Sequence, residues 1–272
     1  MRYRPAAARV LSVLAAALLT AGVAACGDEA PATEPTPSAS ASPPPDPEDA
    51  RIALAARAAL AEDHRFAALY TLDVVGEQPR SVLATVAADG SWRVDIPNGA
   101  LGGTADVSIA QTEAGVFQCA IPSATNLITP SCVRVADEGK RVPKKYDPKI
   151  QRVFRQWLPV FTDRQSALSV TAAQPLPGSS GSCYSVDTIS ASLSAPVDVG
   201  IYCYADDGLL TAARLAFGTL TIASAPAAAP PSIDLPGPVV AGDPMGLSAP
   251  PPPPVTIPPS APVTPTSPAP SA

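Results

Sequence analysis

The sequence contains few of the side chains from which catalytic and metal-binding sites are usually built. Its 272 residues include only one histidine, His64, and aromatic residues make up 5% of the chain. The five cysteines show no C-x-x-C spacing, which argues against a zinc site. No serine lies in a G-x-S-x-G motif, the usual setting of a hydrolase nucleophile. We therefore predict that the protein is not an enzyme and has no catalytic residue, no metal site and no cofactor.

Basic residues are fewer than acidic residues. The chain has 18 lysines and arginines against 24 acidic residues, which gives a formal net charge of −6. Proteins that bind nucleic acid usually carry a basic surface that meets the phosphates. We therefore expect no nucleic-acid partner.

A long apolar run is also missing, but a short one lies near the amino terminus. Three arginines precede an apolar stretch at residues 10–20, which is shorter than the roughly 20 residues of a membrane-spanning helix. A basic start, a short apolar run and small residues before a cleavage point are typical of a secretory signal peptide. We assign residues 1–25 to this signal peptide.

The end of this signal indicates how the mature protein is held. The sequence Val23-Ala24-Ala25-Cys26, followed by Gly27, resembles the lipobox of bacterial lipoproteins. The resemblance implies that the Cys26 sulfur receives a diacylglyceryl group and that cleavage occurs before this cysteine. The protein would then be extracytoplasmic and lipid-anchored to the bacterial cell membrane. The alternative is an ordinary signal peptide followed by an unmodified cysteine.

Proline is abundant, but its distribution is uneven. Of the 35 prolines, seven lie in residues 27–47 and seventeen in residues 226–272. Segments rich in proline, serine and alanine without apolar periodicity bury too little surface to offset the entropy of ordering. We therefore predict a lipidated Cys26 with a disordered tether over residues 26–45, one domain over residues 46–225, and a disordered tail over residues 226–272. The tail would be a spacer or a proline-rich ligand for a partner.

The domain begins with helix signals. Asp46 can cap a helix whose first residue is Pro47, a position that suits proline. We predict that this helix runs to about His64. Its apolar face would consist of Ile52, Ala56, Ala59 and Leu60.

After this helix the apolar period changes to two, as in half-buried strands. Turn signals such as Asp89-Gly90 and Asn98-Gly99 separate the alternating stretches. We predict strands near residues 68–75, 81–87, 91–97, 104–111, 115–121 and 131–136, and then near residues 166–174, 183–190, 199–205, 209–216 and 218–224. Such a series predicts an antiparallel sheet with one apolar face.

A second helix is predicted between the two sets of strands, over residues 148–163. Asp147-Pro148 repeats the cap-and-proline start, and Pro159 is expected to kink or shorten the helix. Apolar side chains recur at helical spacing along this segment. They are Ile150, Val153, Phe154, Trp157, Leu158 and Phe161.

Four cysteines remain after Cys26, and an even number in an oxidising compartment indicates two disulfides. Four cysteines allow three connectivities. We favour Cys119–Cys132 and Cys183–Cys203, because the members of each pair lie on neighbouring predicted strands. Each disulfide would stabilise the fold by about 3 kcal/mol if it acts by restricting the unfolded chain.

The order of these elements resembles the LolA-like lipoprotein-carrier superfamily, which includes LppX/LprG-type lipid-binding lipoproteins and RseB-like sensors. The stretches Gly115-Val116-Phe117-Gln118-Cys119 and Ser182-Cys183-Tyr184-Ser185-Val186 also look like a disulfide pattern of secreted lipoproteins from high-GC Gram-positive bacteria. The resemblance implies an α+β fold, with a curved, unclosed antiparallel β-barrel of about eleven strands, two helices on its concave side and disordered proline-rich flanks. The lipobox and the long tail depart from ordinary LolA.

In that superfamily the barrel covers an apolar cavity, and the resemblance implies one here. The candidate lining is Tyr70, Leu72, Trp92, Val94, Ile150, Phe154, Trp157, Leu158 and Phe161. One hypothesis is therefore a lipoprotein that binds a lipid or another apolar ligand for transport or presentation. The other is a non-enzymatic interaction or stress-sensor lipoprotein, in which these side chains fill the core and the partner is an envelope protein.

One segment is basic in this acidic chain. Between residues 140 and 155 the only acidic residue is Asp147, and the basic residues are Lys140, Arg141, Lys144, Lys145, Lys149, Arg152 and Arg155. In a protein tethered to a membrane they could contact anionic headgroups, at about 1 kcal/mol per residue. The alternative is a solvated face.

Overall fold

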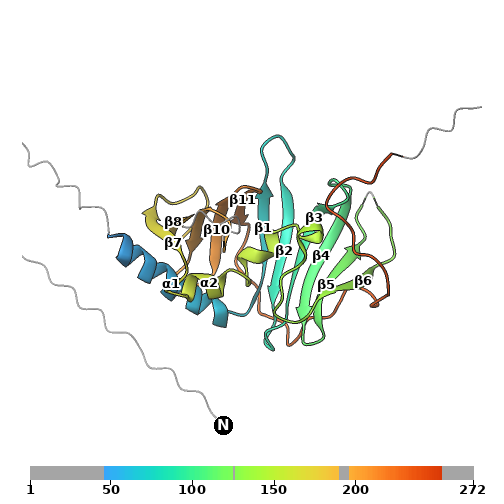
Figure 1. Ribbon diagram of the computed structural model, residues 1–272, viewed down its shortest axis with the longest axis horizontal. Coiled ribbons are helices and arrows are strands. Elements are labelled where there is room, and N and C mark those ends of the chain that lie inside the picture. The colour runs from blue at the N-terminus through green and yellow to red at the C-terminus, as the bar shows by residue number, and fades with distance from the viewer. Residues whose placement is uncertain (1–45, 125, 190–195, 253–272) are drawn as a thin grey trace, which may run out of the picture. The chain divides into compact units, whose positions relative to one another are not determined.

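The computed structural model describes residues 46–124, 126–189 and 196–252. The predicted signal peptide, Cys26 and the tether lie outside the described residues. All described residues belong to one compact unit, whose helices and strands are shown in Figure 1.

Eleven antiparallel strands form a single sheet in this unit. Their bounds are β1 (Phe66–Asp73), β2 (Arg80–Val86), β3 (Trp92–Ala100), β4 (Ala105–Thr112), β5 (Gly115–Ile121), β6 (Ser131–Ala136), β7 (Leu168–Ala173), β8 (Ser182–Thr188), β9 (Gly200–Tyr204), β10 (Leu210–Leu215) and β11 (Gly218–Ile222). Strands β1 to β6 form one meander and β7 to β11 form another, and the two join where β1 pairs with β11. Strands β6 and β7 end the strand order, so the curved sheet is not closed.

Two α-helices, α1 (Pro47–Asp63) and α2 (Leu158–Thr162), lie on the concave side of this sheet. Side chains of both helices share one apolar cluster with the inward side chains of the strands. The predicted α+β class, with about eleven strands in an unclosed sheet and two helices, is therefore confirmed.

The strands form where the sequence alternates with period two. In β1, Phe66, Ala68, Tyr70 and Leu72 are buried, while the residues between them are partly or largely exposed. Successive side chains of a strand point to opposite faces of the sheet, so this alternation places the apolar set in the concave interior. All eleven predicted strands are confirmed, with ends that shift by a few residues.

Helix α1 begins as the sequence predicts but buries a different face. The Asp46 side chain accepts a hydrogen bond from the Glu48 amide at 2.9 Å, and Pro47 is the first helical residue. The predicted face is wrong, because Ile52 and Leu60 are about half exposed, at 48% and 47%. The buried residues are instead Ala50, Leu54, Ala58 and Ala61. Small side chains let the helix backbone approach α2 and β7 closely, so the alanine face packs inward.

The segment between β6 and β7 differs from the prediction of one helix over residues 148–163. It consists of two short 3₁₀ helices, η1 (Lys144–Tyr146) and η2 (Ile150–Val153), followed by α2. Lys149 has a φ of 70°, in the left-handed region that a right-handed helix does not contain, and Pro159 lies in the first turn of α2. These two interruptions replace the long helix by a series of turns, which we call the cover segment (residues 144–162).

The proline-rich tail also differs from the prediction, because residues between 227 and 247 are hydrogen-bonded to the domain at several points. Ala67 and Ala227 exchange two backbone hydrogen bonds, of 3.1 and 2.7 Å. The carbonyls of Pro230 and Pro238 accept from the amides of Ala88 and Cys132, each at 2.9 Å. Proline has no N–H, but its carbonyl still accepts, so an extended proline-rich segment can bind strands and turns in this way. We call residues 227–247 the C-terminal strap, and residues 253–272 lie outside the described residues.

Candidate functional site

The nine predicted cavity residues meet in the interior between the sheet and the cover segment. None of them is more than 5% exposed, and all belong to one continuous apolar cluster. The ring centroids of Tyr70 and Phe154 lie 4.9 Å apart, and those of Phe161 and Tyr202 lie 5.0 Å apart. At such distances aromatic rings are in edge contact. The side chains therefore pack against one another as a filled core.

The tyrosine hydroxyls of this interior mostly bind backbone carbonyls. Tyr70 donates to the Leu210 carbonyl at 2.8 Å, and Tyr202 donates to the Asp198 carbonyl at 2.6 Å. The Tyr204 hydroxyl is buried and has no hydrogen-bond partner among the described residues. Burial raises the pKa of all three tyrosines above the usual value. They are therefore neutral at physiological pH and act as anchors, not as acids or bases.

Arginine side chains attach the cover segment and the chain that follows it to α1. Arg51 donates to the carbonyls of Asp163 and Leu168, both at 2.8 Å. From the other side, Arg155 of the cover segment donates to the carbonyl of Glu62 at 2.6 Å. These contacts hold the cover segment near one end of α1 and the chain that follows it near the other, so lifting them from the sheet would break several charge-assisted hydrogen bonds.

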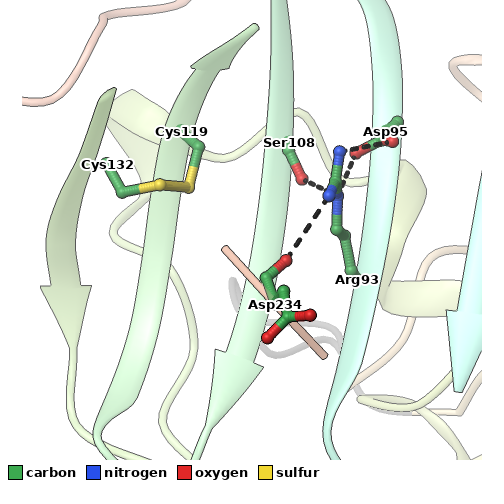
Figure 2. Close-up of a disulfide and its surroundings, with 6 residues drawn as sticks. All are labelled: Arg93, Asp95, Ser108, Cys119, Cys132 and Asp234. Carbon is green, nitrogen blue, oxygen red and sulfur yellow. Dashed lines mark hydrogen bonds and ion pairs between the residues drawn. A yellow bond between two sulfur atoms is a disulfide. The ribbon is translucent and has the colours of Figure 1, made fainter. Parts of the chain in front are cut away.

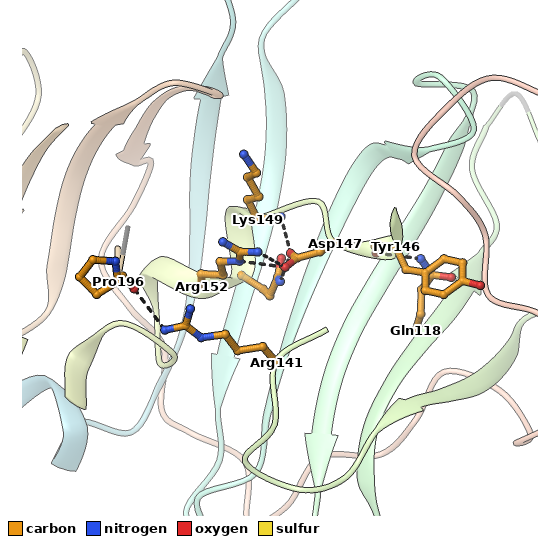
Figure 3. Close-up of polar contacts among 8 residues, drawn as sticks. Gln118, Arg141, Tyr146, Asp147, Lys149, Arg152 and Pro196 are labelled. Atoms are coloured by element: carbon orange, nitrogen blue, oxygen red, sulfur yellow. Dashed lines mark hydrogen bonds and ion pairs between the residues drawn. The ribbon is translucent and has the colours of Figure 1, made fainter. Parts of the chain in front are cut away.

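A buried carboxylate organises the middle of the cover segment, as Figure 3 shows. Asp147 is 1% exposed and accepts from the backbone amide of Lys149 at 2.8 Å and from the side chain of Gln151 at 2.7 Å. Its other oxygen pairs with the Arg152 guanidinium, whose Nε lies 2.9 Å away. Asp147 was predicted as a helix cap, but here it holds two 3₁₀ turns together from inside.

The basic segment divides into an exposed part and an internal part. Arg152 and Arg155 point inward to Asp147 and to the Glu62 carbonyl. Arg141 donates to the carbonyl of Pro196 at 3.1 Å (Figure 3). The exposed members are Lys140, Arg141, Lys144, Lys145 and Lys149. Contact between these exposed cations and anionic headgroups remains a prediction.

A small hollow of about 220 Å³ opens beside the cover segment. Its apolar lining includes Leu72, Ile96, Ile150, Phe217 and Leu247, and Arg80 and Lys149 also lie at it. Arg80 is already paired with Glu77 at 3.1 Å, whereas the Lys149 ammonium has no ion-pair partner within the described part of the chain. The hollow is smaller than the roughly 300–1,000 Å³ of typical ligand pockets.

The carboxyl end of the strap enters a site that was not predicted from the sequence. The Gln118 side chain on β5 is only 2% exposed, and it accepts from the Met245 amide at 2.6 Å and donates to the Met245 carbonyl at 2.9 Å. It also donates to the carbonyl of Tyr146 at 3.3 Å (Figure 3). The available signal was a glutamine inside an apolar strand, because a buried amide needs hydrogen-bond partners.

Both predicted disulfides are confirmed. Cys119 lies opposite Cys132 on β5 and β6, and Cys183 lies opposite Cys203 on β8 and β9. Leu235 of the strap covers the first disulfide together with Phe117. In the same region Arg93 pairs with Asp95 at 2.7 Å and also reaches the carbonyl of Asp234 at 3.5 Å, as Figure 2 shows. The strap is therefore part of the packing around this disulfide.

Comparison with models of known protein families finds no match, and comparison with curated proteins finds no similar protein. The resemblance to the LolA-like superfamily therefore rests on the residues and element order alone. Within the described residues no group of three or more histidine, cysteine or acidic side chains is placed to hold a metal ion. The same residues contain no helix long and apolar enough to cross a membrane.

Proposed function

We propose that the protein is an extracytoplasmic lipoprotein that binds another protein through its surface and is not an enzyme. It would be held at the bacterial cell membrane by the lipid on Cys26. The observation that carries this proposal is the filled interior, since the protein's own aromatic and aliphatic side chains occupy the space in which a carrier would hold its ligand.

Two further features support this reading. Disulfides persist in oxidising compartments outside the cytoplasm, and two of them join neighbouring strands here. The domain also holds an extended proline-rich segment on its surface through backbone hydrogen bonds. A surface that binds its own extended chain has the chemistry to bind one from another protein.

The proposal is tested by following the two tryptophans, because both are in the interior. Trp92 is 2% exposed and Trp157 is fully buried, and the sequence has no other tryptophan. The full-length protein is titrated with a fatty acid brominated along its chain, which quenches tryptophan fluorescence on contact. We expect no saturable quenching beyond that seen with the unbrominated fatty acid. Saturable quenching at one ligand per chain would contradict a filled interior.

A second candidate function is the binding of an apolar ligand with an anionic head, and the hollow beside the cover segment favours it. Leu72 and Ile150 line this hollow and also belong to the predicted cavity set. An acyl chain that entered here would displace the cover segment, gaining about 0.8 kcal/mol for each buried CH₂. The free ammonium of Lys149 would meet the head.

This second function predicts that the brominated fatty acid quenches the wild-type protein. A Leu72→Arg substitution should then abolish the quenching, because it places a charge in the hollow. Leu69→Arg is the matched control, since Leu69 lies on the same strand but is 39% exposed. Equal quenching in both variants would exclude the hollow as the entrance.

A further inference from the structure

Three consecutive residues of the strap form hydrogen bonds to the domain through their backbone groups. Both hydrogen-bonding groups of Met245 bind the Gln118 side chain. The Gly246 carbonyl accepts from the Leu101 amide at 2.8 Å. The Leu247 carbonyl accepts from Gly102 at 2.7 Å, and its amide donates to the carbonyl of Lys145 at 3.1 Å. We call Gln118, Leu101, Gly102 and Lys145 the peptide clamp.

The clamp combines three separate parts of the fold. Gln118 lies on β5, Leu101 and Gly102 lie in the turn between β3 and β4, and Lys145 lies in η1 of the cover segment. Leu101 has a φ of 52°, a left-handed conformation that is uncommon for a leucine. The backbone groups of Leu101 and Gly102 thereby meet the carbonyls of the strap. Backbone N–H and C=O groups bind the backbone of a peptide, so the hydrogen bonds they form do not require one particular peptide sequence.

The side chains of the bound segment show which peptides would fit. Met245 packs against the apolar core, and Leu247 lines the hollow beside the cover segment. Between them, a Cβ on Gly246 would meet no atom within 4 Å. Alternate side chains of an extended peptide face the same way. The clamp therefore accepts apolar side chains at the first and third positions and any side chain at the middle one.

The segment bound in the clamp can dissociate from it, because it is weakly buried and weakly tethered. None of the described residues from 223 onward is fully buried. Between the Val240 amide, which binds Cys132, and the Met245 amide, no hydrogen bond to residues 241–244 occurs in the described chain. Weakly buried segments open locally at low free energy. The clamp can thus empty while the earlier part of the strap stays paired to the sheet.

We propose that the peptide clamp is a recognition site for an extended segment of a partner protein with the pattern apolar–any–apolar. Met245, Gly246 and Leu247 occupy this site in cis as a resident competitor. The inference rests on the proposed function, because the partner is a protein, and it assigns the surface that the partner uses. Partner binding would place an extended segment over the side chain of Gln118 on β5, held through its backbone, with specificity from the two alternate side chains.

The test uses the full-length protein and a fluorescent peptide with the sequence of residues 242–249. A Met245→Asp, Leu247→Asp variant empties the clamp, and peptide binding is followed by fluorescence anisotropy. We expect one peptide to bind per variant chain. The wild-type chain should bind at least about tenfold more weakly, because its own tail competes at an effective concentration of order millimolar. A peptide with Asp in place of Met245 and Leu247 should not bind, and one with Ala in place of Gly246 should bind equally well.

Adding Gln118→Leu to the emptied variant separates recognition from nonspecific binding. We expect peptide binding to fall at least about tenfold, because the bound backbone loses both of its partners on β5. The proposal is overturned if the emptied variant keeps its circular dichroism spectrum and both disulfides but does not bind the peptide. Equal binding with Gln118→Leu would also overturn it.

A second variant covers the case in which the aspartates prevent folding. A chain that ends at residue 242 lacks the clamp occupant without adding charge. If both variants are unfolded and the peptide does not restore them, the segment is only a structural part of the fold and the proposal fails. This failure is distinct from failure of the proposed function, which depends on whether brominated fatty acid reaches Trp157.

Discussion

The carboxylate of Asp147 and the guanidinium of Arg152 form an ion pair that is nearly removed from solvent, inside the turns that cover the sheet. The side chains are 1% and 14% exposed. A buried carboxylate is costly to desolvate, and the pair is stable only because further hydrogen bonds satisfy it. The conformation of the cover segment therefore depends on this one acidic residue.

Replacing Asp147 by alanine should destabilise the protein by about 3 kcal/mol, because Arg152 and Gln151 would lose their shared partner inside the fold. Urea unfolding of the two proteins measures the difference. Asp137→Ala is the control. Asp137 pairs with Arg134, and their side chains are 74% and 53% exposed, so this pair should contribute less than about 1 kcal/mol. Equal losses in the two variants would show that the Asp147 pair has no special role.

The interior tyrosines should respond differently to loss of the hydroxyl. Tyr70→Phe removes the hydrogen bond to the Leu210 carbonyl and should cost about 1 kcal/mol. Tyr204→Phe should be neutral or slightly stabilising, because no described residue pairs with that hydroxyl. Thermal unfolding of both variants checks this. A larger loss for Tyr204→Phe would mean that this hydroxyl has a partner.

Amide hydrogen exchange should show that the strap is bound to the domain. The amides of Ala88 and Cys132 donate to carbonyls of Pro230 and Pro238, so they should exchange slowly in the full-length protein. In a chain that ends at residue 225 their exchange should be at least about tenfold faster, because those partners are gone. The Val94 amide, in the middle of the sheet, is the internal control. Fast exchange at Ala88 and Cys132 in the intact protein would contradict the strap.

Acid should weaken the turn that follows the cover segment. The amide of Gln165 and the hydroxyl of Ser166 donate to the Asp163 carboxylate at 2.9 and 3.0 Å, and the first of these contacts is the main cause that lowers its pKa below the usual 3.8. A carboxylate with a lowered pKa in the folded state stabilises the protein above its unfolded pKa. That contribution is lost as the pH falls through the folded pKa. Between pH 6 and pH 2.5 the stability of Asp163→Asn should fall less than that of wild type, and equal losses would be the contrary result.

The sequence predicts the strands well and the inner face of α1 poorly, for a physical reason. Alternation of apolar and polar residues is a local property of a strand, so it can be read without knowing the neighbours. In α1, whether Leu60 or Ala58 is buried depends on how closely the sheet approaches the helix. The alanine is buried because it allows a short distance between backbones, and the leucine remains outside.

The strap and the packed interior are two further features that the sequence alone predicts only in part. Proline-rich composition predicts a disordered tail over residues 226–272, because it says nothing about where the carbonyls of residues 227–247 find hydrogen-bond donors. The nine candidate residues share one buried apolar cluster, which includes Tyr70 and Trp157. Whether they leave a cavity depends on the turns at Lys149 and Pro159, which set how closely the cover segment packs.

The most direct test of the filled interior is native mass spectrometry of the full-length protein purified from membranes, combined with organic extraction of the same sample. We expect a chain that carries two disulfides and no noncovalent lipid, apart from any lipid attached to Cys26. A discrete lipid that remains bound in the mass spectrometer, and that organic solvent releases in a one-to-one ratio, would contradict it and establish the protein as a carrier.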